Sequence, residues 1–184
     1  MTELRFMLPN WLETEIDRQR IYADDCSRMQ LAIHLAQRNV ENSSGGPFGA
    51  AIFSEEGVLI ATGVNLVVAH NCSVAHAEMM TFMQAQAYLQ RCRLNENGTR
   101  MILATSAQPC CMCYGALFWA GIDEILIGAR AEDVHELTDF DEGPLPNDWM
   151  GELVRRGINV KRDIERETAR GVLAQYAKQG GTCY

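Results

Sequence analysis

Hydrophobic positions recur at helical spacing in several stretches of the chain. In residues 24–41 they fall on one side of a predicted helix, namely Met29, Ile33, Ala36 and Val40. Residues 76–91 also have a helical composition, and the apolar run that begins at Cys110 is typical of a helix that stops at Gly121. A short helix and a final helix near residues 163–178 complete this set.

Strand-like runs alternate with these helices. GAAIFS (49–54) and VLIATGVNLVV (58–68) are separated by a short EEG turn, which predicts a hairpin, and His70 lies at the end of the second run. MILATS (101–106), EILIGA (124–129) and INVKR near the C-terminus are three further predicted strands. Strands that alternate with helices predict an α/β domain in which helices cover both faces of one sheet.

The composition is that of a globular protein with one domain. The chain has 184 residues, and a chain near this length buries about 70% of the surface that its unfolded form exposes. No apolar run approaches the roughly 18–20 residues that span a bilayer, and the N-terminal stretch is not expected to act as a secretory signal. Seven cysteines, an odd number, favour free or metal-bound thiols in a reducing compartment, so we expect a cytoplasmic protein without a membrane partner.

The charge balance argues against a large nucleic acid as partner. The net charge is −8 at pH 7, whereas a protein that holds a long polyanion needs clustered Lys and Arg to displace counterions. Only residues 155–170 are locally basic, and three acidic residues dilute this segment. We expect it to be a solvated helix face.

His76 differs from the other histidines because Glu78 follows it after two positions, at the start of a predicted helix. Residues two positions apart diverge by roughly 200° on a regular helix, so these side chains can share a site only where the helix begins. The remaining histidines, His34, His70 and His135, are expected to be structural or surface residues.

Three cysteines follow a proline within four positions, in the sequence PCCMC. His76, Cys110 and Cys113 would give Zn²⁺ three protein ligands and leave a fourth position for water, as in catalytic zinc sites. Two thiolates nearly cancel the charge of the metal, so a carboxylate must accept the proton of that water, and Glu78 is the candidate. Cys111 with Cys113 is an alternative ligand pair, but its spacing suits one metal at a helix start less well.

The combination of H-x-E with P-C-x-x-C is the signature of zinc-dependent nucleobase deaminases. The chain therefore resembles the cytidine-deaminase-like superfamily. GGPFGA, GVNLVV, AHAE, PCCMCYGALFWAGI and FDEGP make residues 45–160 similar to bacterial guanine deaminases, especially to the subgroup that also deaminates aminotriazines such as ammeline. The resemblance implies a three-layer α/β/α fold with a mixed sheet of about five strands, a homodimer, and a pocket closed by the C-terminal segment.

By this resemblance, residues 1–184 form a single zinc-dependent deaminase domain. Residues 1–23 are an N-terminal extension, and residues 176–184, which end in Tyr184 after two glycines, are expected to cover the active site and contact the substrate. The alternative for this tail is a frayed terminus.

The resemblance also implies contacts to the substrate. Asn65 would hydrogen-bond the base, Phe48 and Trp119 would contact its ring, and the backbone of Ala77 would meet its edge. From the residues alone, Asn65 could instead cap a strand end, and a helical tryptophan is usually part of a core.

The segment FDEGP supplies two acidic residues. Glu142 matches a second carboxylate that handles the substrate in the triazine-active subgroup, and Asp141 matches an acidic residue used in other guanine deaminases. An ordinary solvated loop is the alternative. The sequence departs from the family at Gln108, where many relatives have Glu, and at LTD before this segment, where relatives often have a glycine ahead of the phenylalanine.

These features predict an aminohydrolase that converts guanine and water to xanthine and ammonia, with Glu78 moving protons between the water, a ring nitrogen and the departing amine. The same chemistry could act on ammeline, cytosine, a guanosine-type nucleoside or another aminated heterocycle. A tRNA-editing deaminase is disfavoured by the acidic charge. A non-catalytic zinc protein is disfavoured because a structural site would fill its fourth coordination position and would have no use for Glu78.

Overall fold

The computed structural model describes residues 5–184 and contains one open sheet with the strand order β2-β1-β3-β4-β5. The strands are β1 (Gly49–Ser54), β2 (Leu59–Val64), β3 (Met101–Ala107), β4 (Glu124–Ala129) and β5 (Asn159–Lys161). β1 pairs antiparallel with β2 and β3, whereas β3, β4 and β5 run parallel. The predicted hairpin, and the mixed five-stranded sheet that the family resemblance implies, are both confirmed.

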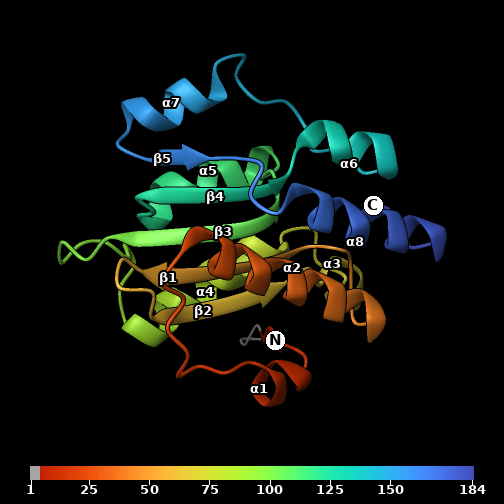
Figure 1. Cartoon of the computed structure of the whole chain (residues 1–184), viewed down its shortest axis with the longest axis horizontal. Helices are drawn as coiled ribbons and strands as arrows, with labels where there is room; N and C mark the ends of the chain where they lie inside the picture. The colour runs from red at the N-terminus through yellow and green to blue at the C-terminus, as the bar shows by residue number, and fades with distance from the viewer. Residues whose placement is uncertain (1–4) are drawn as a thin grey trace.

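The helices lie on both faces of this sheet (Figure 1). They are α1 (Trp11–Glu15), α2 (Asp25–Glu41), α3 (Val67–His70), α4 (Ala77–Leu89), α5 (Cys111–Ala120), α6 (Ala131–Leu137), α7 (Trp149–Arg155) and α8 (Arg166–Lys178). α2 contacts β1 and β3 and α8 contacts β4 on one face, while α4 contacts β2 and β1 on the other and packs against α5. The expected three-layer α/β/α fold is therefore confirmed, and α1, α3 and α6 are helices that the hydrophobic pattern did not indicate.

Two apolar clusters fill the layers between helices and sheet. In β3, Ile102 and Ala104 belong to the cluster beneath α2 and α8, and Leu103 belongs to the cluster beneath α4 and α5. Successive side chains of a strand point to opposite faces, so a strand covered on both faces is buried along its whole length and mostly apolar. All seven residues of β3 are accordingly buried.

The N-terminal extension is part of the packed domain. Of the predicted extension 1–23, the structure describes residues 5–23, and residues 1–4 lie outside the described part. Leu12, Ile16 and Tyr22 are all buried in the cluster that contains α2. α2 then begins with a capping box, in which Asp24 accepts from the backbone N–H of Ser27 and the Ser27 hydroxyl accepts from that of Asp24.

The expected strand over residues 58–68 is wrong in its second half. β2 ends at Val64, and the chain turns at Asn65 into the short helix α3, so His70 ends a helix and not a strand. The turn is held by polar contacts, since the backbone N–H of Leu66 donates to Ala75 and that of Val67 donates weakly to Asn65 Oδ1 at 3.4 Å. The apolar side chains of Leu66 and Val67 are buried, as the pattern of a buried strand would also require, which is why the pattern alone did not reveal the turn.

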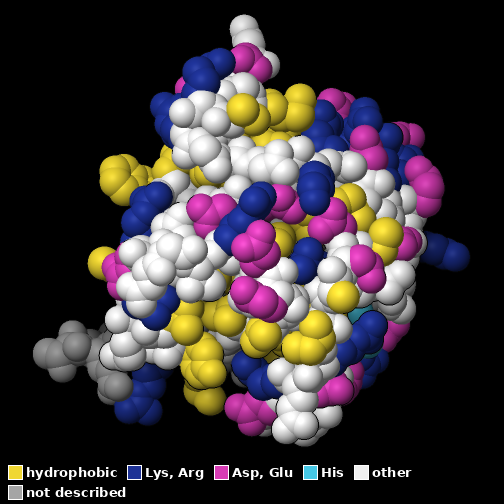
Figure 2. Space-filling model, turned by 60° about the vertical axis from the view of Figure 1, so that its left-hand side comes forward, with side chains coloured by type: hydrophobic (Ala, Val, Ile, Leu, Met, Phe, Trp, Pro, Cys, Tyr) yellow, Lys and Arg dark blue, Asp and Glu magenta, His cyan; other side chains and the backbone are white. Residues whose placement is uncertain are grey.

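The surface carries interspersed charges. On the face shown in Figure 2, Lys and Arg side chains lie among Asp and Glu side chains and form no continuous basic patch. Within residues 5–184, no helix has the length and apolar character that a membrane crossing requires.

Candidate active site

Two helix starts face each other on the side of the sheet that α4 and α5 cover. His76 is the residue before α4 and Cys110 the residue before α5, and both have extended backbone conformations, with φ −70° and ψ 157° for His76 and φ −63° and ψ 171° for Cys110. The expectation that His76 is not yet helical is confirmed. Cys113 then lies in the first turn of α5, where it is fully buried.

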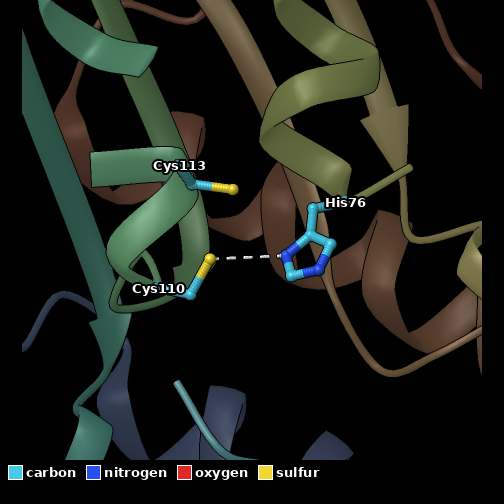
Figure 3. A group of neighbouring side chains, drawn as sticks. All are labelled: His76, Cys110 and Cys113. Carbon is cyan, nitrogen blue, oxygen red and sulfur yellow. Dashed lines mark hydrogen bonds between the residues drawn. The ribbon is translucent and has the colours of Figure 1, made fainter. Parts of the chain in front are cut away.

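The side chains of His76, Cys110 and Cys113 point into one space (Figure 3). One ligand atom from each lies within 4.8 Å of the others, and Cys110 Sγ is 3.5 Å from His76 Nδ1. In a tetrahedral zinc site with ordinary Zn–N and Zn–S bonds, a nitrogen and a sulfur ligand are about 3.6 Å apart. The donor set and its spacing thus fit zinc.

The two thiols differ in their ease of ionisation. Hydrogen bonds from the Cys113 thiol and from His76 lower the pKa of Cys110 to about 4, although burial opposes this, so Cys110 is a thiolate at neutral pH. The bond to this thiolate, together with burial, raises the pKa of Cys113. Burial lowers the pKa of His76, but the Cys110 thiolate and nearby Glu78 outweigh it, and the net shift is upward.

Glu78 lies directly against the three potential ligands. Its side chain is 7% exposed, Oε1 accepts a hydrogen bond from the Thr105 hydroxyl at 3.2 Å, and Oε2 accepts one from the Cys113 thiol at 3.4 Å. Burial, and then the negative charge of Cys110, raise the pKa of Glu78. A carboxyl group with a raised pKa, beside a neighbouring hydroxyl, is suited to accept a proton and return it.

A cavity of about 520 Å³ opens beside this cluster. Its walls include Phe48, Asn65, His76, Glu78, Gln108, Cys110, Phe140, Asp141, Glu142 and Tyr184. Most of the residues to which the sequence and the family resemblance assigned a role therefore meet at one place.

The C-terminal residue reaches into this cavity. The Asn65 amide donates a short hydrogen bond to the Tyr184 hydroxyl, and the Tyr184 ring makes edge contacts with Phe140 and His76 at centroid distances of 5.1 and 6.1 Å. Burial raises the pKa of Tyr184, so its hydroxyl stays protonated. The tail is docked on its own chain and not frayed.

Asn65 is held in place by a second amide. The side-chain amide of Asn39, which is fully buried, donates to the backbone oxygens of Gly46 and Asn65, each at 2.8 Å. Its Oδ1 accepts from the Ser44 hydroxyl at 2.7 Å. A Cβ at Gly45 would lie 1.9 Å from the Asn65 oxygen, so only glycine allows this close approach.

The loop after α6 places two carboxylates differently. Asp141 is exposed, and its Oδ1 accepts from the backbone N–H of Gly143 at 2.8 Å, so this carboxylate shapes the turn as well as lining the cavity. Glu142 is half-buried, and its backbone oxygen accepts from Cys111 at the start of α5. Burial, Cys110 and Glu78 raise the pKa of Glu142 to about 8.

Two expected substrate contacts are placed elsewhere. Trp119 is 80% exposed near the far end of α5 and does not line the cavity of its own chain, so its contact with a base stays a prediction. Helical rotation over the six residues from Cys113 carries it to the outer side of the helix. Ala77 is buried and also does not line the cavity, although its neighbours His76 and Glu78 do.

Three supporting residues were missed in the sequence. Thr105, Asn39 and Phe140 orient Glu78, the Asn65 turn and the tail, respectively. Asn39 interrupts the apolar side of the predicted helix 24–41, and such a buried polar residue is a usable signal. Thr105 lies in a run that is otherwise consistent with an ordinary strand, and nothing in the sequence singles it out.

Comparison with known proteins places this geometry in a family. Residues 23–129 match the zinc-binding region of cytidine and deoxycytidylate deaminases. The chain belongs to this deaminase family. A guanine deaminase of Bacillus subtilis is 37% identical over 114 residues, which cover 62% of this chain and 69% of the relative. A tRNA-specific adenosine deaminase of Buchnera aphidicola is 28% identical over 150 residues, which cover 82% of this chain and 91% of the relative.

Solved structures of this deaminase family match almost the whole chain. A guanine deaminase from Nitrosomonas europaea has a TM-score of 0.91 at 39% identity and covers 96% of this chain and 97% of its own. A similar structure, at a TM-score of 0.90 and 39% identity, is a complex with 2,6-diaminopurine and covers 98% of this chain and 95% of its own.

Proposed function

We propose that this deaminase hydrolyses guanine to xanthine and ammonia. The observation that carries the proposal is the buried Glu78 carboxyl group, held against the His76, Cys110 and Cys113 cluster at the wall of a cavity. The Bacillus and Nitrosomonas guanine deaminases to which the chain is similar support guanine as the substrate. The net charge of −8 argues against a tRNA substrate.

The three ligand residues would hold zinc, which when bound acidifies water and stabilises negative charge that develops on the substrate. Glu78 would take one proton from the attacking water and give it to the ring nitrogen next to C2. It would then take the remaining proton of the added hydroxyl group and give it to the amino group, which leaves as ammonia while the C2 oxygen becomes the oxo group of xanthine. Thr105 lies against the Glu78 carboxyl group and helps to fix its position, because its hydroxyl is 3.2 Å from Oε1; the same hydroxyl is 3.0 Å from the Ala107 oxygen, its other acceptor.

The remaining cavity residues would bind the base. Phe48 offers an aromatic surface, the Asn65 side chain offers both a donor and an acceptor, and Glu142 offers a carboxyl group for N–H groups of the base. Because the pKa of Glu142 is raised to about 8, this residue can also give up or accept a proton near neutral pH. Asp141 lies at the rim and would act through its charge.

The tail would shield the site from water. Tyr184 contacts Asn65 and Phe140 at the cavity. The Tyr176 hydroxyl donates a hydrogen bond to the backbone oxygen of Thr182 at 2.8 Å, which holds the tail residues that lead to Tyr184. A segment of this kind can exclude water during the reaction and release the product when it opens.

The protein would act as a homodimer in a reducing compartment, the cytoplasm. The outer side of α5 supports a dimer, since Pro109 to Ile122 contain no charged residue while Trp119 is 80% exposed. All seven cysteines are free thiols, which suits a reducing environment. Sedimentation of the parent and of Trp119→Glu tests the dimer, and an unchanged monomeric mass for both would contradict it.

Substitution of Glu142 tests the site as a whole. Glu142→Gln and removal of the last five residues should each reduce guanine turnover while zinc content and thermal midpoint stay nearly the same. If both variants turn over guanine like the parent, the substrate site built on the loop and the tail is wrong. If only the truncated protein behaves normally, the shielding role is wrong and the carboxyl role stands.

A further inference from the structure

Gln108 lies in the wall of the cavity, but it takes part neither in the proposed proton transfers nor in the proposed contacts with the base. It follows β3 directly, and its backbone N–H donates to the Ala129 oxygen at 2.8 Å, which fixes its main chain beside β4. The residue is only 6% exposed and lines the same cavity as Asn65 and Glu142. Because it is two residues from Cys110, it stands at the end of the cavity where the ligand cluster lies.

The carboxamide of Gln108 has no hydrogen-bond partner within residues 5–184. Its polar atoms are also not fully buried. Within residues 5–184, the side-chain polar atoms that are both fully buried and without a partner belong to Arg28, Thr62 and Arg162. Its polar atoms therefore reach open space, and the space that the residue lines is the cavity. Two other amides contrast with it, since Asn39 and Gln84 are both bonded to backbone groups.

The carboxamide opens onto the cavity and is bonded to no other group of residues 5–184, so it is available to a ligand that enters. Such groups persist where they serve a ligand. The Gln108 carboxamide differs in chemistry from the carboxyl groups that line the same cavity. Glu78 and Glu142 carry carboxyl groups, whereas a carboxamide is neutral and, by rotation, presents either an N–H donor or an oxygen acceptor.

We propose that Gln108 is a specificity residue that hydrogen-bonds the second exocyclic group of the purine, the group on the ring carbon that is not deaminated. In guanine this group is the 6-oxo oxygen, which would accept from the Gln108 amide. A 6-amino group would donate to the amide oxygen instead, so purines with either group would bind. The proposal rests on the proposed function, because it takes an aminopurine as the ligand.

The test compares two ligands and two substitutions. Calorimetry on the zinc-loaded protein gives the Kd for 8-azaguanine, which carries the oxygen, and for 2-aminopurine, which lacks it. Gln108→Met keeps the length of the side chain and removes the amide. We expect the Kd for 8-azaguanine to rise about ten-fold and the Kd for 2-aminopurine to change less than about two-fold. The thermal midpoint should stay nearly the same, since the amide is bonded to no other group of residues 5–184.

Gln84→Met is the matched control. The Gln84 oxygen accepts from the Thr62 backbone N–H at 2.8 Å, so this variant should have a lower thermal midpoint and the parent values of both Kd. If the parent binds 8-azaguanine and deaminates guanine, two results would overturn the role of Gln108. One is an equal rise of both Kd values in Gln108→Met, and the other is no rise of either. A parent that does neither contradicts the proposed function itself.

Discussion

Replacement of Glu78 by Gln removes the proton-transfer group and leaves its shape. The glutamine can keep the hydrogen bond from Thr105, because its side-chain oxygen can occupy the position of Oε1, 3.2 Å from that hydroxyl. Its amide nitrogen would then face Cys113, where Oε2 now lies 3.4 Å from the sulfur. The substitution also removes a carboxyl group that burial makes difficult to ionise. We therefore expect no loss of thermal stability.

The expected effect is on turnover. A positioned general acid–base group contributes roughly 10²–10⁴ in rate, which corresponds to about 2.7–5.4 kcal/mol of transition-state stabilisation. The assay is steady-state ammonia release from guanine, with zinc content and thermal midpoint measured on the same preparations. Glu167→Gln, at a side chain that is 87% exposed, is the matched control and should keep the parent rate. Near-parent turnover by Glu78→Gln at full zinc content would refute the assignment of the proton-transfer role.

Three further perturbations separate metal binding, tail docking and folding. Cys113→Ser should lower zinc content from about one per chain towards zero, whereas Cys111→Ser should not, and equal loss in both would show that the ligand pair is wrong. Gly181→Ala should raise the KM for guanine at constant zinc content, because an added Cβ would lie 2.3 Å from the Tyr176 ring; an unchanged KM would contradict a docked tail. Asp133 is buried, and its carboxylate accepts hydrogen bonds from the side chains of Arg166 and Arg170. These hydrogen bonds hold the pKa of Asp133 below its usual value. The ionised carboxylate therefore stabilises the fold above a pH of about 4, and this stabilisation is lost as the pH falls further. Asp133→Asn should lower the free energy of unfolding at pH 7 by about 1–3 kcal/mol, and the difference from the parent should shrink in denaturant titrations at pH 3; a constant difference would be contrary to this reasoning.

The sequence predicted the layers of the fold because its apolar runs have the period of the element they form. It predicted the ligand cluster because His76 and the two cysteines lie beside helix starts, where local spacing decides which side chains can meet. The turn at Asn65 was missed, since Leu66 and Val67, at the start of α3, are apolar and buried, as residues of a buried strand would also be. The hydrogen bonds that make this turn come from residues distant in the sequence.

Side-chain direction was harder to predict than position along the chain. Trp119 lies on the same helix as Cys113, but the rotation of that helix turns it outward, where only contacts in an assembly could cover it. Thr105 and Asn39 act through other residues, and long-range packing alone brings them to Glu78 and Asn65. Gln108 was visible as a departure from related sequences, but its unpaired amide is a property of the folded cavity.

The most direct test of guanine deamination is ammonia release by the zinc-loaded protein from a panel of guanine, ammeline, cytosine, guanosine and adenosine. The predicted result is equimolar ammonia and xanthine from guanine, with a higher kcat/KM than for any other compound. Removal of zinc by a chelator should abolish this activity. Release from another compound with none from guanine would contradict the substrate assignment, and no release from any compound would contradict the proposed reaction.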